Sequence, residues 1–108
     1  AHPVVVITSS DTGAVQRTLE GHRVRGVAEV VGGDVEPSKM LKIESSRRRY
    51  GRLREAWYVC DTVGDVAEAR AAGASVVGAC WGWHGEERLL RAHPDRMARR
   101  PSDLLGLL

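Results

Sequence analysis

The 108-residue sequence has few of the features that mark secreted, membrane-spanning or nucleic-acid-binding chains. Its two cysteines, Cys60 and Cys80, form no Cys-x-x-Cys pair, so we expect reduced thiols in the cytoplasm and no disulfide framework. No apolar run approaches the roughly 18 residues of a membrane span, and we expect no signal peptide. The formal charge is only +2, from 16 basic and 14 acidic residues. This balance predicts neither a nucleic-acid nor a membrane partner.

Apolar strand-like runs alternate along the chain with helix-like runs, and we expect residues 1–108 to form a single domain. The first run, Pro3 to Ile7, ends in four consecutive β-branched residues, which is typical of a parallel strand covered on both faces. The alternation predicts an α/β fold, a three-layer α/β/α sandwich with a Rossmann-like, mostly parallel sheet. Further strands are expected at 27–31, 56–60, 75–80 and 97–99, and helices at 12–20, 39–50, 66–72, 85–92 and from 101 onward.

Ligands of open parallel sheets bind beyond the carboxyl ends of the strands, so the residues that follow each strand matter most. Small hydroxyls and backbone amides there suit a phosphate, and paired carboxylates suit Mg²⁺. Asp61 follows an apolar strand and Asp65 lies four residues later at a helix start, which places both carboxylates over one spot. The strand-end segments are Thr8 to Asp11, Gly33 to Asp34, Asp61 to Asp65, and Trp81 to His84. We expect the two tryptophans of the last segment to serve packing or to form a pocket wall.

Tyr58 to Gly73 resembles the fourth motif of haloacid dehalogenase superfamily phosphatases, which is an apolar strand, Gly-Asp-x-x-x-Asp and an alanine-rich helix. Val6 to Ser10 is similar to the second motif, a strand ending in serine or threonine. Ser38-Lys39 lies where the third motif places its lysine. Since Val77 to Trp83 and the segments after it are also similar to this family, the resemblance covers nearly all 108 residues.

The resemblance implies hydrolysis of a phosphomonoester, in the manner of phosphoglycolate phosphatase, with a phosphorylated small molecule as the partner. It implies that Thr8 and Ser9 bind phosphoryl oxygens, and that Lys39 neutralises charge on the phosphate. Thr8 and Lys39 would then be catalytic, with Lys42 as the alternative lysine. Asp61 and Asp65 would bind Mg²⁺. Such a division suits phosphoryl transfer, in which positioning and charge neutralisation dominate catalysis.

The sequence departs from the family at its first motif. The nucleophilic aspartate of Asp-x-Asp-x-Thr has no counterpart, since no Asp-x-Asp occurs in the sequence, and the cap is missing too. Cys60 also replaces the usual glycine before the metal-site aspartate. We therefore expect the C-terminal core portion of such a protein, inactive by itself. The absent first strand would leave two strand edges unpaired, at a cost of about 1–3 kcal/mol for each orphaned buried group.

Three arrangements would satisfy those edges: direct pairing of the two strands, a strand from a second copy or a complementing chain, or a longer polypeptide. The alternative function is a truncated, non-catalytic pseudoenzyme that binds phosphate or a protein and oligomerises through an exposed sheet edge. A receiver-like signalling domain ranks below both, because it needs paired acids after a first strand. Asp11-Thr12-Gly13 resembles an aspartic protease motif, but those proteases are all-β, and this sequence is not.

Overall fold

The computed structural model describes residues 3–50 and 55–107. The chain divides into two compact units, Ala1–Arg52 and Leu53–Leu108, and each is described by itself. A single domain over residues 1–108 stays a prediction.

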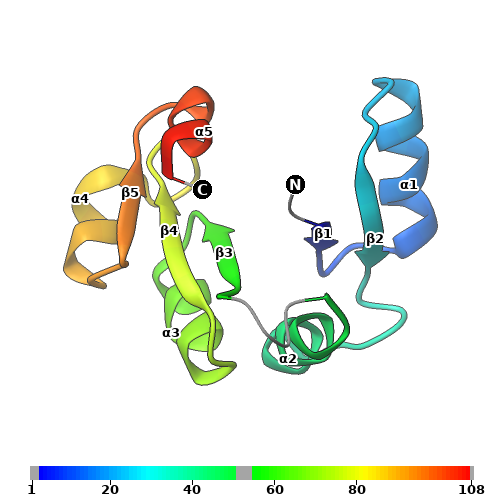
Figure 1. Cartoon of the computed structure of the whole chain (residues 1–108), viewed down its shortest axis with the longest axis horizontal. Helices are drawn as coiled ribbons and strands as arrows, with labels where there is room; N and C mark the ends of the chain where they lie inside the picture. Colours follow the sequence, from blue (N-terminus) through cyan, green and yellow to red (C-terminus); the bar gives the residue numbers. More distant parts are fainter. Residues whose placement is uncertain (1–2, 51–54, 108) are drawn as a thin grey trace. The chain divides into compact units, whose positions relative to one another are not determined.

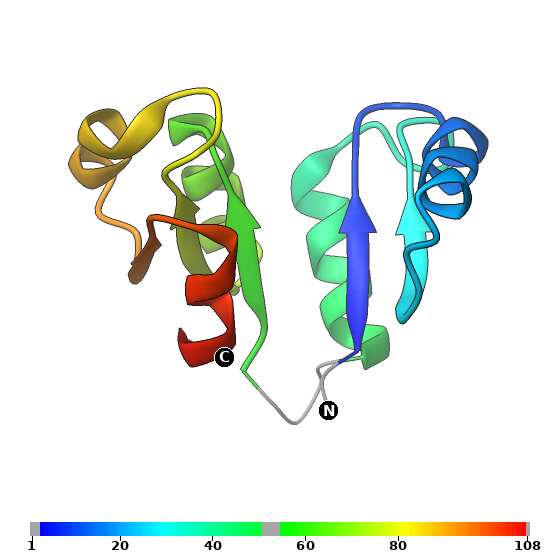
Figure 2. The same ribbon diagram turned by 90° about the horizontal axis from the view of Figure 1, so that it is seen from above.

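The first unit is a two-stranded parallel sheet with two helices. Strands β1 (Val4–Ile7) and β2 (Val27–Val31) pair in parallel. Helix α1 (Thr12–Gly21) packs against β2, and α2 (Lys39–Tyr50) packs against β1. The two helices lie on opposite sides of the strand pair (Figures 1 and 2). The β–α–β–α order predicted for this part of the chain is confirmed.

Helix α1 has a side-chain cap at its start, and helix α2 has a buried face that is partly polar. Helix α1 begins where the Asp11 carboxylate accepts a hydrogen bond from Ala14 N, 3.0 Å away. In α2, the apolar residues Met40 and Leu41 are exposed, whereas Ile43 is buried. Lys42 and Ser46 are buried beside Ile43. The buried face of α2 is therefore partly polar, which hydrophobic patterning does not reveal.

The second unit is a three-stranded parallel sheet in the order β3-β4-β5. Its strands are β3 (Trp57–Cys60), β4 (Ser75–Ala79) and β5 (Arg96–Ala98), and its helices are α3 (Val63–Ala71), α4 (Gly85–Arg91) and α5 (Leu104–Leu107). The central strand β4 is buried, and it packs against α3 and α4. Helix α3 begins three residues earlier than predicted because Thr62 caps it. The final helix is shorter than predicted, since Pro101–Asp103 forms a 3₁₀ turn before α5.

Strands β1 and β3, which the missing first strand of the family would separate, each pair with only one described strand. Strand β1 pairs with β2, and β3 pairs with β4, in separate sheets. Val4 is exposed, and Val5, Val6 and Ile7 are half-buried. The coverage of this strand on both faces stays a prediction.

No helix within residues 3–50 and 55–107 has both the length and the apolar character that a membrane crossing requires.

Candidate functional site

Thr8 lies directly after β1, where its backbone extends the pairing with β2. Thr8 N donates to Val31 O at 3.1 Å, and the Thr8 hydroxyl oxygen accepts a hydrogen bond from Ser10 N at 3.0 Å. The side chain is half-buried, and the next residue, Ser9, is exposed. The hydroxyl predicted to contact phosphate is therefore held at the strand end by the turn that follows it.

The loop after β1 is fixed by the loop after β2. Gly33 N donates to Ser10 O at 2.9 Å. At Gly32, an added Cβ would lie 2.5 Å from Thr12 Oγ1 and 2.6 Å from Ser10 O, which is too close for any other residue without movement of the loop. The two glycines therefore allow these loops to approach closely.

Asp34 connects this pair of loops to helix α1. Its Oδ1 accepts from Thr12 N at 2.7 Å and from Thr12 Oγ1 at 2.8 Å, and that hydroxyl oxygen in turn accepts from Gly32 N at 3.0 Å. The hydrogen bond from the Thr12 backbone lowers the pKa of the Asp34 carboxyl, and the bond from the Thr12 hydroxyl adds to it. Asp34 and Asp11 thus occupy two N–H groups at the start of α1 with the protein's own carboxylates.

Lys42 is the lysine that the structure ties to the end of β1. Its Nζ donates to Thr8 O at 2.8 Å, and the residue is only 1% exposed. Lys39, the lysine implied by the third-motif resemblance, lies one turn earlier in α2 and is half-buried. Residues three apart on a helix are neighbours, so both lysines are on the same side of α2. The choice between them now has a geometric basis, with Lys42 at the strand end.

Asp61 directly follows β3, and the loop after β4 holds it in place. Asp61 Oδ2 accepts from Trp83 N at 2.9 Å, and its backbone oxygen accepts from His84 N at 3.2 Å. Gly82 completes the contact, because a Cβ there would lie 2.2 Å from Asp61 Cβ. The carboxylate is therefore oriented by one main-chain N–H group, which occupies Oδ2 of its two oxygens.

Asp65 lies in the first turn of α3, as predicted. Its backbone N donates to Thr62 Oγ1 at 3.2 Å, so Thr62 is the N-cap of the helix. Burial raises the pKa of the Tyr58 hydroxyl, and the negative charge of Asp65 raises it further. Tyr58 thus stays protonated beside the acidic start of α3.

Two carboxylates are chemically suited to form part of the ligand set of Mg²⁺. Mg²⁺ commonly takes one or two carboxylates and completes its octahedron with water and phosphate oxygens. Within the described residues, no group of three or more histidine, cysteine or acidic side chains is arranged to hold a metal. A cation bound at Asp61 and Asp65 would thus depend on water, substrate or further protein ligands.

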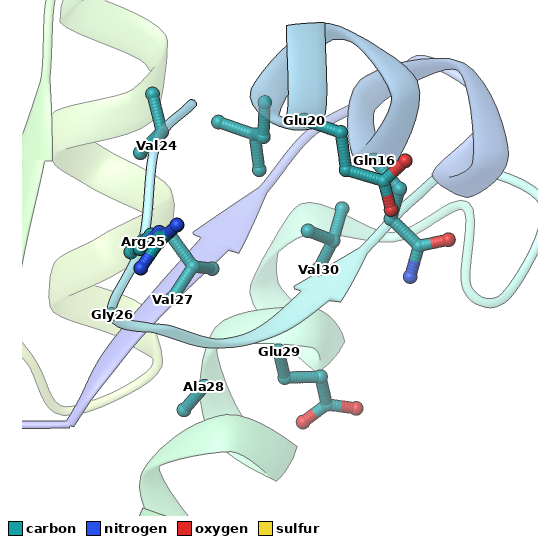
Figure 3. Close-up of a pocket in the computed structure, with 10 residues that line it drawn as sticks. Gln16, Glu20, Val24, Arg25, Gly26, Val27, Ala28, Glu29 and Val30 are labelled. Carbon is teal, nitrogen blue, oxygen red and sulfur yellow. The ribbon is translucent and has the colours of Figure 1, made fainter. Parts of the chain in front are cut away.

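The side chains of the two tryptophans after β4 are exposed, and a pocket of the first unit lies apart from the predicted site residues. Trp83 is 84% exposed and Trp81 is exposed too, so neither is packed into the core of the described structure, and their role as a pocket wall stays a prediction. A pocket of about 290 Å³ lies in the first unit between α1 and β2 (Figure 3). It contains none of the predicted site residues; its lining includes Leu19, Glu20, Val24, Arg25, Glu29 and Val30.

Sequence reasoning missed the hydrogen bonds that join separate loops. The bond of Lys42 to Thr8 spans 34 positions, and that of Val63 to His84 spans 21. Gly82 was the available signal, since a glycine in the loop directly after a strand is favoured where another segment approaches the backbone closely. Trp81 to His84 was recognised as a strand-end segment, but its contacts with Asp61 were not predicted.

The same architecture occurs in solved structures of hydrolases. A haloacid dehalogenase-like hydrolase from Streptococcus pneumoniae matches with a TM-score of 0.84 at 24% identity, over 97% of this chain and 51% of that one. A predicted phosphoglycolate phosphatase from Haemophilus somnus matches with a TM-score of 0.83 at 22% identity, over 97% of this chain and 49% of that one. The fold is therefore the α/β, Rossmann-like fold of haloacid dehalogenase-like proteins, as predicted.

Curated proteins match at the level of sequence. A phosphoglycolate phosphatase from Synechococcus elongatus is 31% identical over 108 residues, which is 93% of this chain and 48% of that protein. The pyrophosphatase PpaX from Bacillus pumilus is 39% identical over 54 residues, which is 50% of this chain and 25% of that protein. No family model matches.

These similarities confirm the resemblance to the haloacid dehalogenase superfamily. The chain spans about half the length of the first curated relative and a quarter of the second.

Proposed function

We propose that this chain supplies the phosphate- and cation-binding part of a haloacid dehalogenase-type phosphatase that acts on a phosphorylated small molecule. The observation that carries the proposal is Asp61, whose carboxylate is oriented by Trp83 N at the end of β3, with Asp65 four residues later in the first turn of α3. The sequence likeness to phosphoglycolate phosphatase supports the substrate class.

The proposed roles follow from the chemistry of each group. The Thr8 hydroxyl donates to a phosphoryl oxygen, with Ser9 beside it, and a lysine of α2 offsets phosphate charge. Asp61 and Asp65 hold Mg²⁺, which when bound neutralises charge on the phosphoryl group. Lys42 suits the lysine role better than Lys39, because its Nζ is fixed at the carbonyl of Thr8. These groups bind and position the phosphate, which is the larger share of catalysis in phosphoryl transfer.

The nucleophile is the group that these 108 residues do not supply, since no Asp-x-Asp occurs among them. This absence also favours the second candidate function, a non-catalytic module that binds phosphate or a partner protein through the same strand ends.

The first prediction is that the 108-residue chain does not hydrolyse p-nitrophenyl phosphate with Mg²⁺. Without a carboxylate placed to attack phosphorus, the aspartyl-phosphate route of this family is closed. A colorimetric assay compares the chain with Asp61→Ala, and both should match the buffer rate. Robust hydrolysis that disappears in Asp61→Ala would show that another residue of this chain serves as the nucleophile.

A further inference from the structure

The loop after β4 reaches the start of α3 through the side chain of His84. Val63 N, the first N–H of α3, donates to His84 Nδ1 at 3.0 Å. His84 N donates in turn to Asp61 O at 3.2 Å. A single residue therefore fixes the Asp61–Val63 turn at both ends, through its backbone on one side and its imidazole on the other.

His84 occupies the N-cap position of its own helix, α4, but its side chain makes no capping hydrogen bond there. The ring instead caps the neighbouring helix α3, where Thr62 already satisfies Asp65 N. The position of His84 at the start of α4 therefore does not explain where its side chain binds. The first N–H groups of a helix have no partner within the helix. In α3, Thr62 accepts from Asp65 N, and His84, from the loop after β4, accepts from Val63 N.

The imidazole has a defined tautomer in this geometry. To accept from Val63 N, the Nδ1 atom must carry a lone pair, so the proton of the neutral ring lies on Nε2. An asparagine at this position places its Oδ1 where Nδ1 lies, two bonds from Cβ, and can keep the acceptor. An alanine removes it.

We propose that His84 is a positioning residue for the cation site, and that it sets the affinity of the site by holding the Asp61–Val63 turn. The inference rests on the proposed function, in which Asp61 and Asp65 bind the cation. Asp61 is the first residue of this turn, and Asp65 lies two residues after its end. Loss of the hydrogen bond to Val63 N therefore makes the segment that joins the two acids less rigid. Residues that orient metal ligands typically change metal affinity by about 10–100-fold when they are removed.

The test is a Mn²⁺ titration of the 108-residue chain followed by electron paramagnetic resonance, with Mn²⁺ in place of Mg²⁺. We expect His84→Ala to weaken Mn²⁺ binding about tenfold or more, and His84→Asn to restore most of the affinity. Glu87→Gln, which removes an exposed acid of α4 two residues beyond Gly85, is the matched control and should bind as the wild type does.

The outcomes separate the inference from the function on which it rests. If the wild type binds Mn²⁺ and Asp61→Asn does not, but His84→Ala binds normally, the positioning role is refuted and the site stands. If the wild type does not bind Mn²⁺, the proposed function fails as well. Nitrogen NMR of the His84 ring gives a reading that does not depend on the folding of the alanine variant, because a proton on Nδ1 would exclude the Val63 bond.

Discussion

The side chains at the strand ends are oriented mainly by backbone groups. Asp61 Oδ2 accepts from Trp83 N, and Lys42 Nζ donates to Thr8 O. A main-chain partner moves less than a flexible side chain, so the carboxylate and the ammonium are placed before any ligand binds. Such preorganisation is the form of electrostatic stabilisation that contributes most to charged transition states.

At this scale, the structure predicts which lysine binds phosphate. Lys42→Met should weaken the binding of inorganic phosphate in the presence of Mg²⁺ by about tenfold, since a hydrogen bond to a charged group contributes about 1.5–3 kcal/mol. Lys39→Met should change it by less than Lys42→Met does, because the hydrogen bond to Thr8 O places Lys42 Nζ at the end of β1, whereas Lys39 lies one turn earlier in α2. Isothermal titration calorimetry measures both affinities, with circular dichroism to verify that each variant is folded. A larger loss in Lys39→Met would return the role to Lys39.

At the scale of the elements, pairs of loops fix one another. The loop after β2 holds the loop after β1 through Asp34 and Gly32, and the loop after β4 holds the loop after β3 through Gly82 and His84. In each unit, the strand-end residues predicted from the sequence are therefore supported by the end of the next strand along the chain. This is the position at which open α/β sheets bind ligands.

The Asp34 carboxyl gives the first of these loop pairs a pH dependence. Its pKa is lowered in the folded state, so it contributes stability above the unfolded value of about 3.9, and this contribution is lost as pH falls through the folded pKa. We expect the stability difference between the wild type and Asp34→Asn to be constant from pH 7 to about pH 5 and to shrink below about pH 4. Urea unfolding followed by circular dichroism gives this difference. A difference that stays the same down to pH 3 would contradict the role assigned to Asp34.

Local sequence patterns predicted the elements but not the contacts between loops. The alternation of strands and helices was readable because β4 is a continuous apolar run and Gly73 follows α3 at its end. Asp61 and Asp65 were readable because a single short motif contains both. The partners of Asp61 and Lys42 depend on which loops the fold brings together, and hydrophobic periodicity carries no such information. The same reason explains why the polar face of α2 was missed.

At the scale of the whole molecule, the described chain consists of two α/β units. Each unit has a sheet of parallel strands and a set of polar groups at its strand ends. The first provides Thr8 and Lys42, and the second provides Asp61 and Asp65. Strands β1 and β3 each pair on one edge. The three predicted arrangements for these edges all stay open: direct pairing of the two strands, a strand from a second copy or a complementing chain, and a longer polypeptide. The fold and the sequence likeness agree on the haloacid dehalogenase-like class.

The proposed role of Asp61 as a cation ligand can be tested by a Mn²⁺ titration of the wild type, Asp61→Asn and Glu87→Gln. The exchange to asparagine removes the charge but keeps an oxygen that can accept from Trp83 N, so the loop contact is retained. We expect the wild type and Glu87→Gln to bind Mn²⁺ alike and Asp61→Asn to lose binding. Equal binding by the wild type and Asp61→Asn, or no binding by the wild type, would contradict this role.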